Sequence, residues 1–311
     1  MSSRPFDLFP AEETHILTVE DAVLDNEGAA QRIKHTTATY LQLRNCQLMA
    51  PLHSPSFSPL QSALSTNSSL TSLELTGCRP TSSLLPHIAT ALCLNKSITQ
   101  LGISAALSDT EAAILASKML SQSSHLQVLN LFRNRLSNDG TKELVRGLQT
   151  HSLSSLTLAS NHIGLEGARS IAEFLTRNTS LVELNLSWNY IGAEGALALS
   201  SAVTINSSLR ILELGANKLG DEGARHMSAA IAQNSSLHLV DLSLNSITQE
   251  GVSLVRDALY LNPSIETMYL RDLLISQPAL QEIKFLSSRN SHNMSLRSVS
   301  LFNMLLFICA I

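Results

Sequence analysis

Three acidic residues in the second half of the chain have types and spacing suited to joint chemistry. Glu213 and Asp241 hold the same position in two similar stretches, "LRILELGANKLGDEGA" from Leu209 and "LHLVDLSLNSITQEGV" from Leu237. If these stretches are adjacent parallel strands, the two carboxylates lie about 5 Å apart. Glu183 lies two positions earlier in the preceding copy. Like charges this close destabilise a sheet, so we expect a ligand or another group to offset them.

Two kinds of chemistry fit such a pair. One is binding of a basic partner, because exposed aromatic and apolar side chains at nearby outward positions would complete a binding hot spot. The other is glycoside hydrolysis, whose retaining form needs two carboxylates at a similar separation. The glycosidase interpretation is the weaker one, because the pattern provides no cleft that would exclude water and raise the pKa of one carboxyl.

We therefore predict a partner-binding surface on the outward positions of these strands. An ordinary solvated face is the alternative, but exposed Trp and Phe favour binding. Leu244 adds apolar area beside the predicted residues, which are Asn130, Phe132, Arg133, Glu183, Asn185, Trp188, Glu213, Asp241, Tyr269 and Arg271.

These residues are positioned by a repeated unit. "LVELNLSWNYIGAEGA", from Leu181, has leucines three and two residues apart, which is neither a helical period nor a simple strand alternation. Close copies begin at Leu126, Leu153, Leu181, Leu209 and Leu237, and weaker ones at Ala38, Leu70, Ile98, Ile265 and Leu296. Most successive copies begin 28 residues apart, and a fixed period of this size indicates a solenoid of stacked units.

Within a copy, alternation over residues such as 183–187 predicts a short strand with leucines inward and polar residues outward. Stacked copies then form one parallel sheet, with rows such as Leu129, Leu156, Leu184, Leu212 and Val240 buried. We expect asparagine carboxamides to bind backbone groups where the strands end, at Asn134, Asn161, Asn189, Asn217 and Asn245. A glycine, as at Gly195, is expected in a turn before a helix with small or aliphatic residues on its inner side.

The predicted fold class is α/β: a curved horseshoe solenoid with a parallel sheet on the concave face and helices on the convex face. Residues 38–306 form about ten repeats. Residues 1–37 form an N-terminal cap, either a degenerate repeat or a lone amphipathic helix over 20–34. Residues 307–311 are an apolar tail, which is a cap, an interface or a truncated repeat, and the whole apolar stretch is too short for a bilayer.

The frame LxxLxLxxNxIgxeGa, followed by a helix, resembles leucine-rich repeats of the ribonuclease-inhibitor subtype over residues 38–306. Ribonuclease inhibitor, the Ran GTPase-activating protein, tropomodulins, immune-receptor sensor regions and effectors of intracellular bacteria share this subtype. The resemblance implies a cytoplasmic, non-catalytic scaffold that binds a protein on its concave face. It leaves open a regulator of a small GTPase, with Arg133 as the nearest rim arginine, and a pathogen effector that binds a host protein.

Composition and motif content narrow the function further. The net charge of −4 and the lack of basic runs argue against nucleic acid as a partner. Neither the ten histidines nor the four cysteines show metal-ligand spacing, and phosphate-binding loops and nucleophile elbows are missing from the sequence. We therefore expect no enzyme activity, cofactor, metal or small-molecule substrate. Cys46 and Cys78 take the asparagine position of their copies, and buried reduced thiols there fit a cytosolic setting. The N-x-S/T triplets, which are the pattern for glycosylation, are numerous because most belong to the repeated "NSSL" junction.

Overall fold

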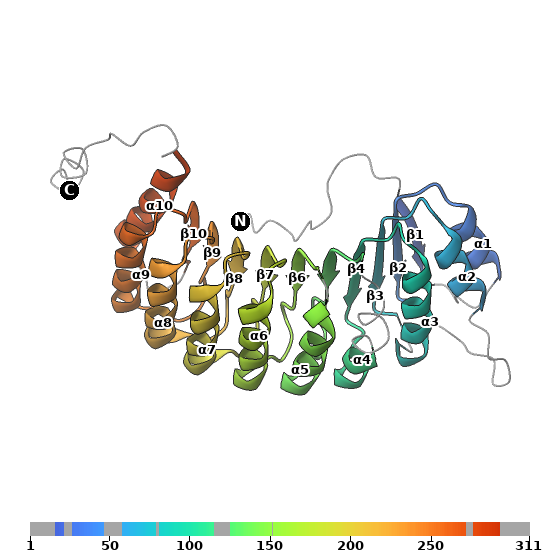
Figure 1. The fold of residues 1–311 in the computed structure, drawn as a ribbon, viewed down its shortest axis with the longest axis horizontal. Helices are drawn as coiled ribbons and strands as arrows, with labels where there is room; N and C mark the ends of the chain where they lie inside the picture. The colour runs from blue at the N-terminus through green and yellow to red at the C-terminus, as the bar shows by residue number, and fades with distance from the viewer. Residues whose placement is uncertain are drawn as a thin grey trace.

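The computed structural model describes residues 16–21, 27–46, 58–78, 81–114, 125–150, 152–271 and 276–292. In this part of the chain, strands alternate with helices and form one curved α/β solenoid (Figure 1). The strands line the inner side of the arc and the helices line the outer side. The predicted fold class is therefore confirmed. The repeat copy expected from Leu296 and the tail at 307–311 lie outside the described residues.

The strands make a single parallel sheet in chain order. They are β1 (Ile16–Glu20), β2 (Tyr40–Arg44), β3 (Ser72–Thr76), β4 (Gln100–Ser104), β5 (Val128–Asn130), β6 (Ser155–Thr157), β7 (Glu183–Asn185), β8 (Ile211–Glu213), β9 (Leu239–Asp241) and β10 (Thr267–Tyr269). The helices are α1 (Glu27–His35), α2 (Ser58–Thr66), α3 (Thr81–Leu94), α4 (Asp109–Ile114), α5 (Asn138–Gly147), α6 (Leu165–Arg177), α7 (Gly192–Ile205), α8 (Gly220–Gln233), α9 (Gln249–Leu261) and α10 (Gln277–His292).

The sheet register is the one that the repeat frame predicts. Leu184 pairs with Leu212, which pairs with Val240, and Asn185, Glu213 and Asp241 pair in the same way on the outward side. The strand β7 is shorter than the predicted 183–187, because Ser187 N–H donates to the Asn185 side chain at 2.9 Å. In the predicted N-terminal cap, the strand β1 pairs with β2 of the next unit, and the helix α1 follows β1. The cap therefore contains a strand as well as a helix.

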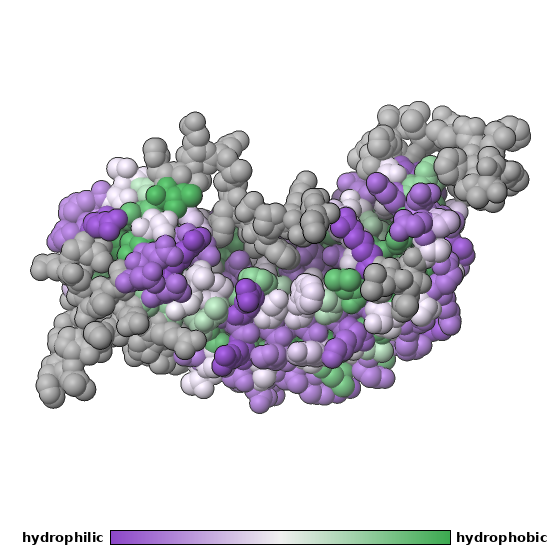
Figure 2. Space-filling view, turned by 180° about the vertical axis from the view of Figure 1, so that it is seen from behind, coloured by the Kyte–Doolittle hydropathy of each residue, from purple (hydrophilic) through white to green (hydrophobic). Residues whose placement is uncertain are grey.

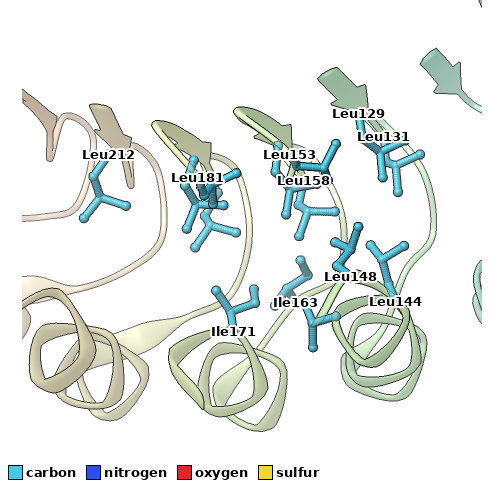
Figure 3. Packing of buried hydrophobic residues seen from close by; sticks show 14 of the residues in the cluster. Leu129, Leu131, Leu144, Leu148, Leu153, Leu158, Ile163, Ile171, Leu181 and Leu212 are labelled. Carbon is cyan, nitrogen blue, oxygen red and sulfur yellow. The ribbon is translucent and has the colours of Figure 1, made fainter. Parts of the chain in front are cut away.

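The inward leucines form a continuous core between the sheet and the helices (Figure 3). Figure 3 shows leucines from successive strands in a row above aliphatic side chains of the helices, such as Leu144 and Ile171. Leu212 is 0% exposed and Leu184 is 1% exposed. Each unit buries its apolar face against the next one, so the core is long rather than round.

Asparagines at the strand ends form a hydrogen-bonded ladder. Asn217 Nδ2 donates to Leu186 O of the preceding repeat at 2.9 Å and to Leu214 O of its own at 3.0 Å. Asn134, Asn161, Asn189 and Asn245 bond in the same way. The expected role of these carboxamides is confirmed. Cys46 and Cys78 replace them at the earlier repeats, where their thiols donate to Val19 O and Leu43 O at 3.4 Å.

A second ladder runs along the helix ends and explains the N-x-S/T triplets. Asn206 Nδ2 donates to Leu175 O at 2.8 Å and to Asn178 O at 3.0 Å. Asn234 repeats these contacts with Val203 O and Asn206 O. Both side chains are buried, so glycans on them are incompatible with the folded repeat.

The expectation that the repeated glycines lie in turns is wrong. Gly195 and its equivalents, Gly140, Gly167, Gly223 and Gly251, lie inside the first turn of their helices. A Cβ on Gly195 would lie 2.6 Å from Ile191 Cγ2 and 3.2 Å from Ala168 Cβ of the preceding helix. Crowding by the residue four positions earlier, together with the neighbouring helix, therefore requires glycine there, and a turn conformation does not.

Candidate functional site

The acidic group lies on three neighbouring strands. Glu213 on β8 pairs directly with Asp241 on β9, and Glu183 lies on β7 beside Ile211. Burial raises the pKa of Glu213 to about 7, and the charges of Asp241 and Glu183 add to this effect. The raised pKa arises from burial among neighbouring side chains and from the adjacent carboxylates, and it does not need a cleft of the kind that the sequence argument considered. The strand-to-strand spacing puts two carboxylates together where solvent screens them less than on an open surface.

None of these three carboxylates forms an ion pair within the described residues. Glu213 Oε2 accepts a hydrogen bond from Asn185 Nδ2, and Asp241 Oδ1 accepts one from Ser243 N–H at 2.8 Å. These bonds hold the carboxylates in place, but they bring no positive charge. Among the residues that the structure describes, the negative charge of the group is therefore offset only by the dipoles of hydrogen-bond donors.

The carboxylate Glu74, in the same row on β3, has a different environment. Gln42 Nε2 donates to its Oε2 and Thr76 Oγ1 to its Oε1, both at 3.0 Å, and Tyr40 also donates to Oε2. Burial, together with Glu74, raises the pKa of the Tyr40 hydroxyl above its usual value. The N-terminal end of the concave face is therefore a satisfied polar network, whereas the acidic group on β7–β9 is not.

Large apolar side chains stand beside the acidic group. Trp188 is 58% exposed, Leu244 is 52% exposed and Tyr269 is 42% exposed. Trp188 and Leu244 have φ angles of 60° and 58°, in the left-handed region that costs free energy for residues other than glycine. Arg271 lies 5.9 Å from the Tyr269 ring centroid, as a cation–π contact requires. The same left-handed backbone recurs at this position of other repeats, at Arg133, Ser160 and Ala216, so it belongs to the repeat and not to this surface. The exposed aromatic area is the feature that is typical of a functional surface.

The structure divides the predicted surface into two parts. Glu183, Asn185, Trp188, Glu213, Asp241, Tyr269 and Arg271 lie on or directly after the consecutive strands β7–β10. Asn130, Phe132 and Arg133 lie on or after β5, three strands and roughly 14 Å from Glu213. Phe132 therefore does not adjoin the acidic group, contrary to the sequence interpretation.

Asn185 also differs from expectation, because it is buried and only 7% exposed. Its two side-chain atoms are used internally, by Glu213 and by the Ser187 N–H. It therefore supports Glu213 rather than contacting a partner. The sequence interpretation missed this because an outward strand position is exposed only where its neighbours are small.

Sequence reasoning also missed Ser187 and Gly215, which lie next to the acidic group on the concave face. The sequence signal that could have identified this place is a glycine, Gly215, at an outward position of the repeat. On the loops after the strands it further missed a stack in which the rings of His162 and Tyr190 are 6.1 Å apart and Lys218 Nζ is 4.9 Å from the Tyr190 ring. Each of these three residues follows an asparagine of the strand-end ladder.

Figure 2 views the solenoid from behind and shows mostly hydrophilic residues, with hydrophobic ones in small separate areas.

None of the described helices has the length and hydropathy needed to cross a bilayer. Across the same described residues, no three or more His, Cys, Asp or Glu side chains are grouped to hold a metal ion.

Comparison with known proteins agrees with this architecture. A family model described as Leucine Rich repeat matches residues 122–145, 149–172, 177–200, 206–228 and 233–255. The five matched segments are similar to leucine-rich repeats, and the parallel sheet with its outer helices forms a curved α/β solenoid. No curated protein sequence gives a significant match to the chain.

Two solved structures are similar over more than half of the chain. The leiomodin-1 actin-binding site 2 is 17% identical, with a TM-score of 0.44, over 56% of this chain and 97% of that one. The C-terminal domain of tropomodulin from Caenorhabditis elegans is 16% identical, with a TM-score of 0.33, over 61% of this chain and 81% of that one.

Proposed function

We propose that this protein is a non-catalytic interaction scaffold that binds a basic protein partner on the concave face of β7–β10. The observation that carries the proposal is the group Glu183, Glu213 and Asp241, which has no cationic partner among the described residues and adjoins exposed Trp188. A cation from a partner would offset the repulsion that the free protein bears. Trp188 and Tyr269 would supply the apolar anchors of the interface.

The proposed mode of binding couples affinity to protonation. Glu213 has a pKa of about 7, so it is partly protonated at neutral pH. A cation beside it favours the ionised form. Binding should therefore release a proton, and affinity should increase between pH 6 and pH 8 because the ionised form becomes more populated.

We further place the repeats in the ribonuclease-inhibitor subtype and the protein in the cytoplasm. The frame of the five close copies and the helix after each strand support the subtype. The cytoplasmic proposal is supported by Cys46 and Cys78, whose S–H groups act as hydrogen-bond donors in the strand-end ladder and must remain reduced to do so.

The test is affinity capture with the wild-type protein, followed by titration of the captured partner. The double variant Glu213→Gln with Asp241→Asn should weaken binding and lower its dependence on salt, because the screened attraction is lost. Trp188→Ala should also weaken binding, with little change in salt dependence. Asp139→Asn with Glu194→Gln, which removes the same charge from exposed positions on α5 and α7, is the matched control. A partner that binds all variants equally would rule out the concave face.

A second candidate function follows from the raised pKa of Glu213. A carboxyl with a raised pKa, paired across the strands with a second carboxyl at Asp241, is the kind of arrangement that a retaining glycoside hydrolase uses for its acid and its nucleophile. Hydrolysis of a panel of aryl glycosides that is abolished by Glu213→Gln alone would support this candidate. Unchanged background hydrolysis in wild type and variant would exclude it.

A further inference from the structure

The ladder of asparagines along the helix ends is interrupted between Asn95 and Asn206. On either side of this gap, each junction asparagine donates from Nδ2 to two carbonyl groups of the preceding repeat, as at Asn67, Asn95, Asn206, Asn234 and Asn262. In the copy after Asn95, the sequence has Ser123 in this place. The equivalent carbonyls belong to Leu92 and Asn95, so this junction lacks the asparagine that fastens the others.

His125 stands at the same junction, in a place that serine holds in other copies. Three such serines donate from Oγ to the carbonyl of the junction asparagine one copy earlier, at 3.4, 3.5 and 3.1 Å for Ser97, Ser208 and Ser236. By the same spacing, His125 faces Asn95 O. Both of its ring nitrogens are buried, and neither makes a hydrogen bond within the described part of the chain. A buried polar atom without a partner is unfavourable, so this contact is weaker than the serine contacts.

The surroundings of the ring oppose a positive charge on it. Burial lowers the pKa of His125 below its usual value, and the ammonium group of Lys96 lowers it further. The carbonyl groups of Asn95 and Leu92 favour the protonated ring, but they do not offset these two effects. Lys96 Nζ donates to Cys93 O at 3.0 Å, which keeps its charge beside the junction. The folded junction therefore favours the neutral imidazole.

Other ionisable groups on the elements around this junction are neutral, engaged or distant. On α3, burial raises the pKa of the Cys93 thiol, and His87 is hydrogen-bonded to α2. On α5, Lys142 is exposed and Glu143 pairs with Arg146 in solvent. The acidic residues in the first turns of α4 and α5, at the opposite end from the junction, are Asp109, Glu111 and Asp139. Neither β4 nor β5 has a titratable side chain, and the same is true of the short helix at Leu148–Thr150.

We propose that the junction at His125 is an acid-sensitive contact, which the uncharged imidazole closes at neutral pH and which protonation of the ring opens in acid, so that β5 loosens from β4. Directly after His125, the N–H groups of Gln127 and Val128 both donate to Thr99 O, at 2.8 and 3.1 Å. These bonds join the repeat of β5 to that of β4, and they break when the charged ring leaves the junction. The acidic group on β7–β9 lies further along the sheet and keeps its structure.

The direction of the effect follows from the lowered pKa of His125. In the open junction the ring has its ordinary pKa of 6.5, so it takes up a proton that the closed junction disfavours. The contact therefore has its full stability above about pH 6.5 and loses it as the pH falls. Protonation of Glu213 stabilises the folded protein over part of the same range. Global unfolding combines these opposing contributions, so the test needs a local measurement.

Amide hydrogen exchange of the full chain at pH 5.5 and pH 7.5, corrected for the intrinsic exchange rate at each pH, provides this measurement. Mass spectrometry of peptides that contain Gln127 and Val128 should show that their protection falls several-fold at the lower pH. Arg210 and Ile211 are the internal control, because their N–H groups bond Val182 O in the same way, at 2.8 and 3.0 Å. Their junction has both the asparagine and the serine, so their protection should not fall.

Two variants test the role of the ring and its charge. His125→Ser restores the serine of the other junctions, which does not titrate, so it should abolish the loss of protection in acid. Lys96→Gln removes the exposed positive charge beside the ring and should make the loss smaller, because the protonated ring then costs less in the closed junction. A ring that only fills space would not respond to this change. His162→Ser, which removes an exposed histidine on a distant loop, should behave as the wild type.

Three outcomes would overturn the inference. One is equal protection of Gln127 and Val128 at both pH values in the wild type. Another is a loss in acid that persists in His125→Ser, which would assign the sensitivity to another group. If His125→Ser does not fold, an unchanged loss in Lys96→Gln overturns the inference by itself. None of these results bears on the binding of a basic partner to β7–β10, which the charge variants of Glu213 and Asp241 test separately.

Discussion

Glu213 on β8 and Asp241 on β9 are paired residues of adjacent parallel strands, and no cation among the described residues forms an ion pair with either. The pairing brings two acidic side chains to neighbouring positions of one sheet face. Glu183 lies on β7, the strand on the other side of β8. The free protein therefore bears an electrostatic cost that a partner can remove. This relationship leads to the first prediction.

The stability of the protein should fall as the pH rises from about 5 to 8. The folded-state pKa of Glu213 is raised to about 7 from a reference of 4.5, by burial first and then by Asp241 and Glu183. The folded state thus binds the proton more tightly, so this stabilisation is complete below the unfolded pKa and is lost as the pH passes through 7. Glu213→Gln should reduce the fall by about 1–2 kcal/mol after allowance for solvent screening.

Urea unfolding at pH 5, 6, 7 and 8 measures this difference. Glu194→Gln, at an exposed position on α7, should leave the pH profile of the wild type unchanged. Parallel profiles for wild type and Glu213→Gln would contradict the assigned pKa. Tyr269 and Arg271 also face this region from β10 and the loop after it, and neither is altered in these variants.

Leu212→Ala should lower the free energy of unfolding by roughly 2–5 kcal/mol, because it leaves a cavity in the leucine row. Leu212 is 0% exposed and pairs with Leu184 on one side and Val240 on the other. Gln233→Ala, at an exposed position at the end of α8, should cost little. Chemical denaturation of the three proteins measures both effects, and similar losses would refute the register.

Asn217→Ala should cost roughly 2–3 kcal/mol, because it leaves buried carbonyl groups without a donor. Asn217 is 0% exposed, and its Nδ2 bonds both Leu186 O and Leu214 O. Cys78→Ala, at the same place in the ladder, should cost less, since a thiol is a weaker donor. Equal losses at the two positions in thermal or urea unfolding would show that the ladder bonds do not contribute as the geometry indicates.

Trp188→Gly should give a more stable protein than Trp188→Ala, by roughly 1 kcal/mol, because glycine adopts the left-handed conformation without a steric cost. Trp188 has a φ of 60° and a largely exposed side chain, so both variants lose little packing. Comparison of their urea midpoints isolates the backbone contribution. The usual order, with alanine more stable than glycine, would show that the strain at this position is relieved in another way.

The sequence by itself determined the solenoid, the register and the rows of residues. A constant repeat length puts equivalent residues side by side, so the pairing of Glu213 with Asp241 and the burial of Leu212 followed from the frame alone. The strand-end asparagines were predictable for the same reason, because their polar side chains occur at one fixed place in an apolar frame.

The tertiary structure decided which of these positions are available. Asn185 and Ser187 both follow the outward pattern, but neighbouring strands bury them, and the same burial raises the pKa of Glu213. The repeated glycines leave room for the side chain four positions earlier and for the preceding helix. The outward residues of β5 lie too far from β8 to join the acidic group. A repeat frame specifies which residues are neighbours. Burial and pKa depend on the size and charge of side chains on several strands at once, and only the folded sheet brings these together.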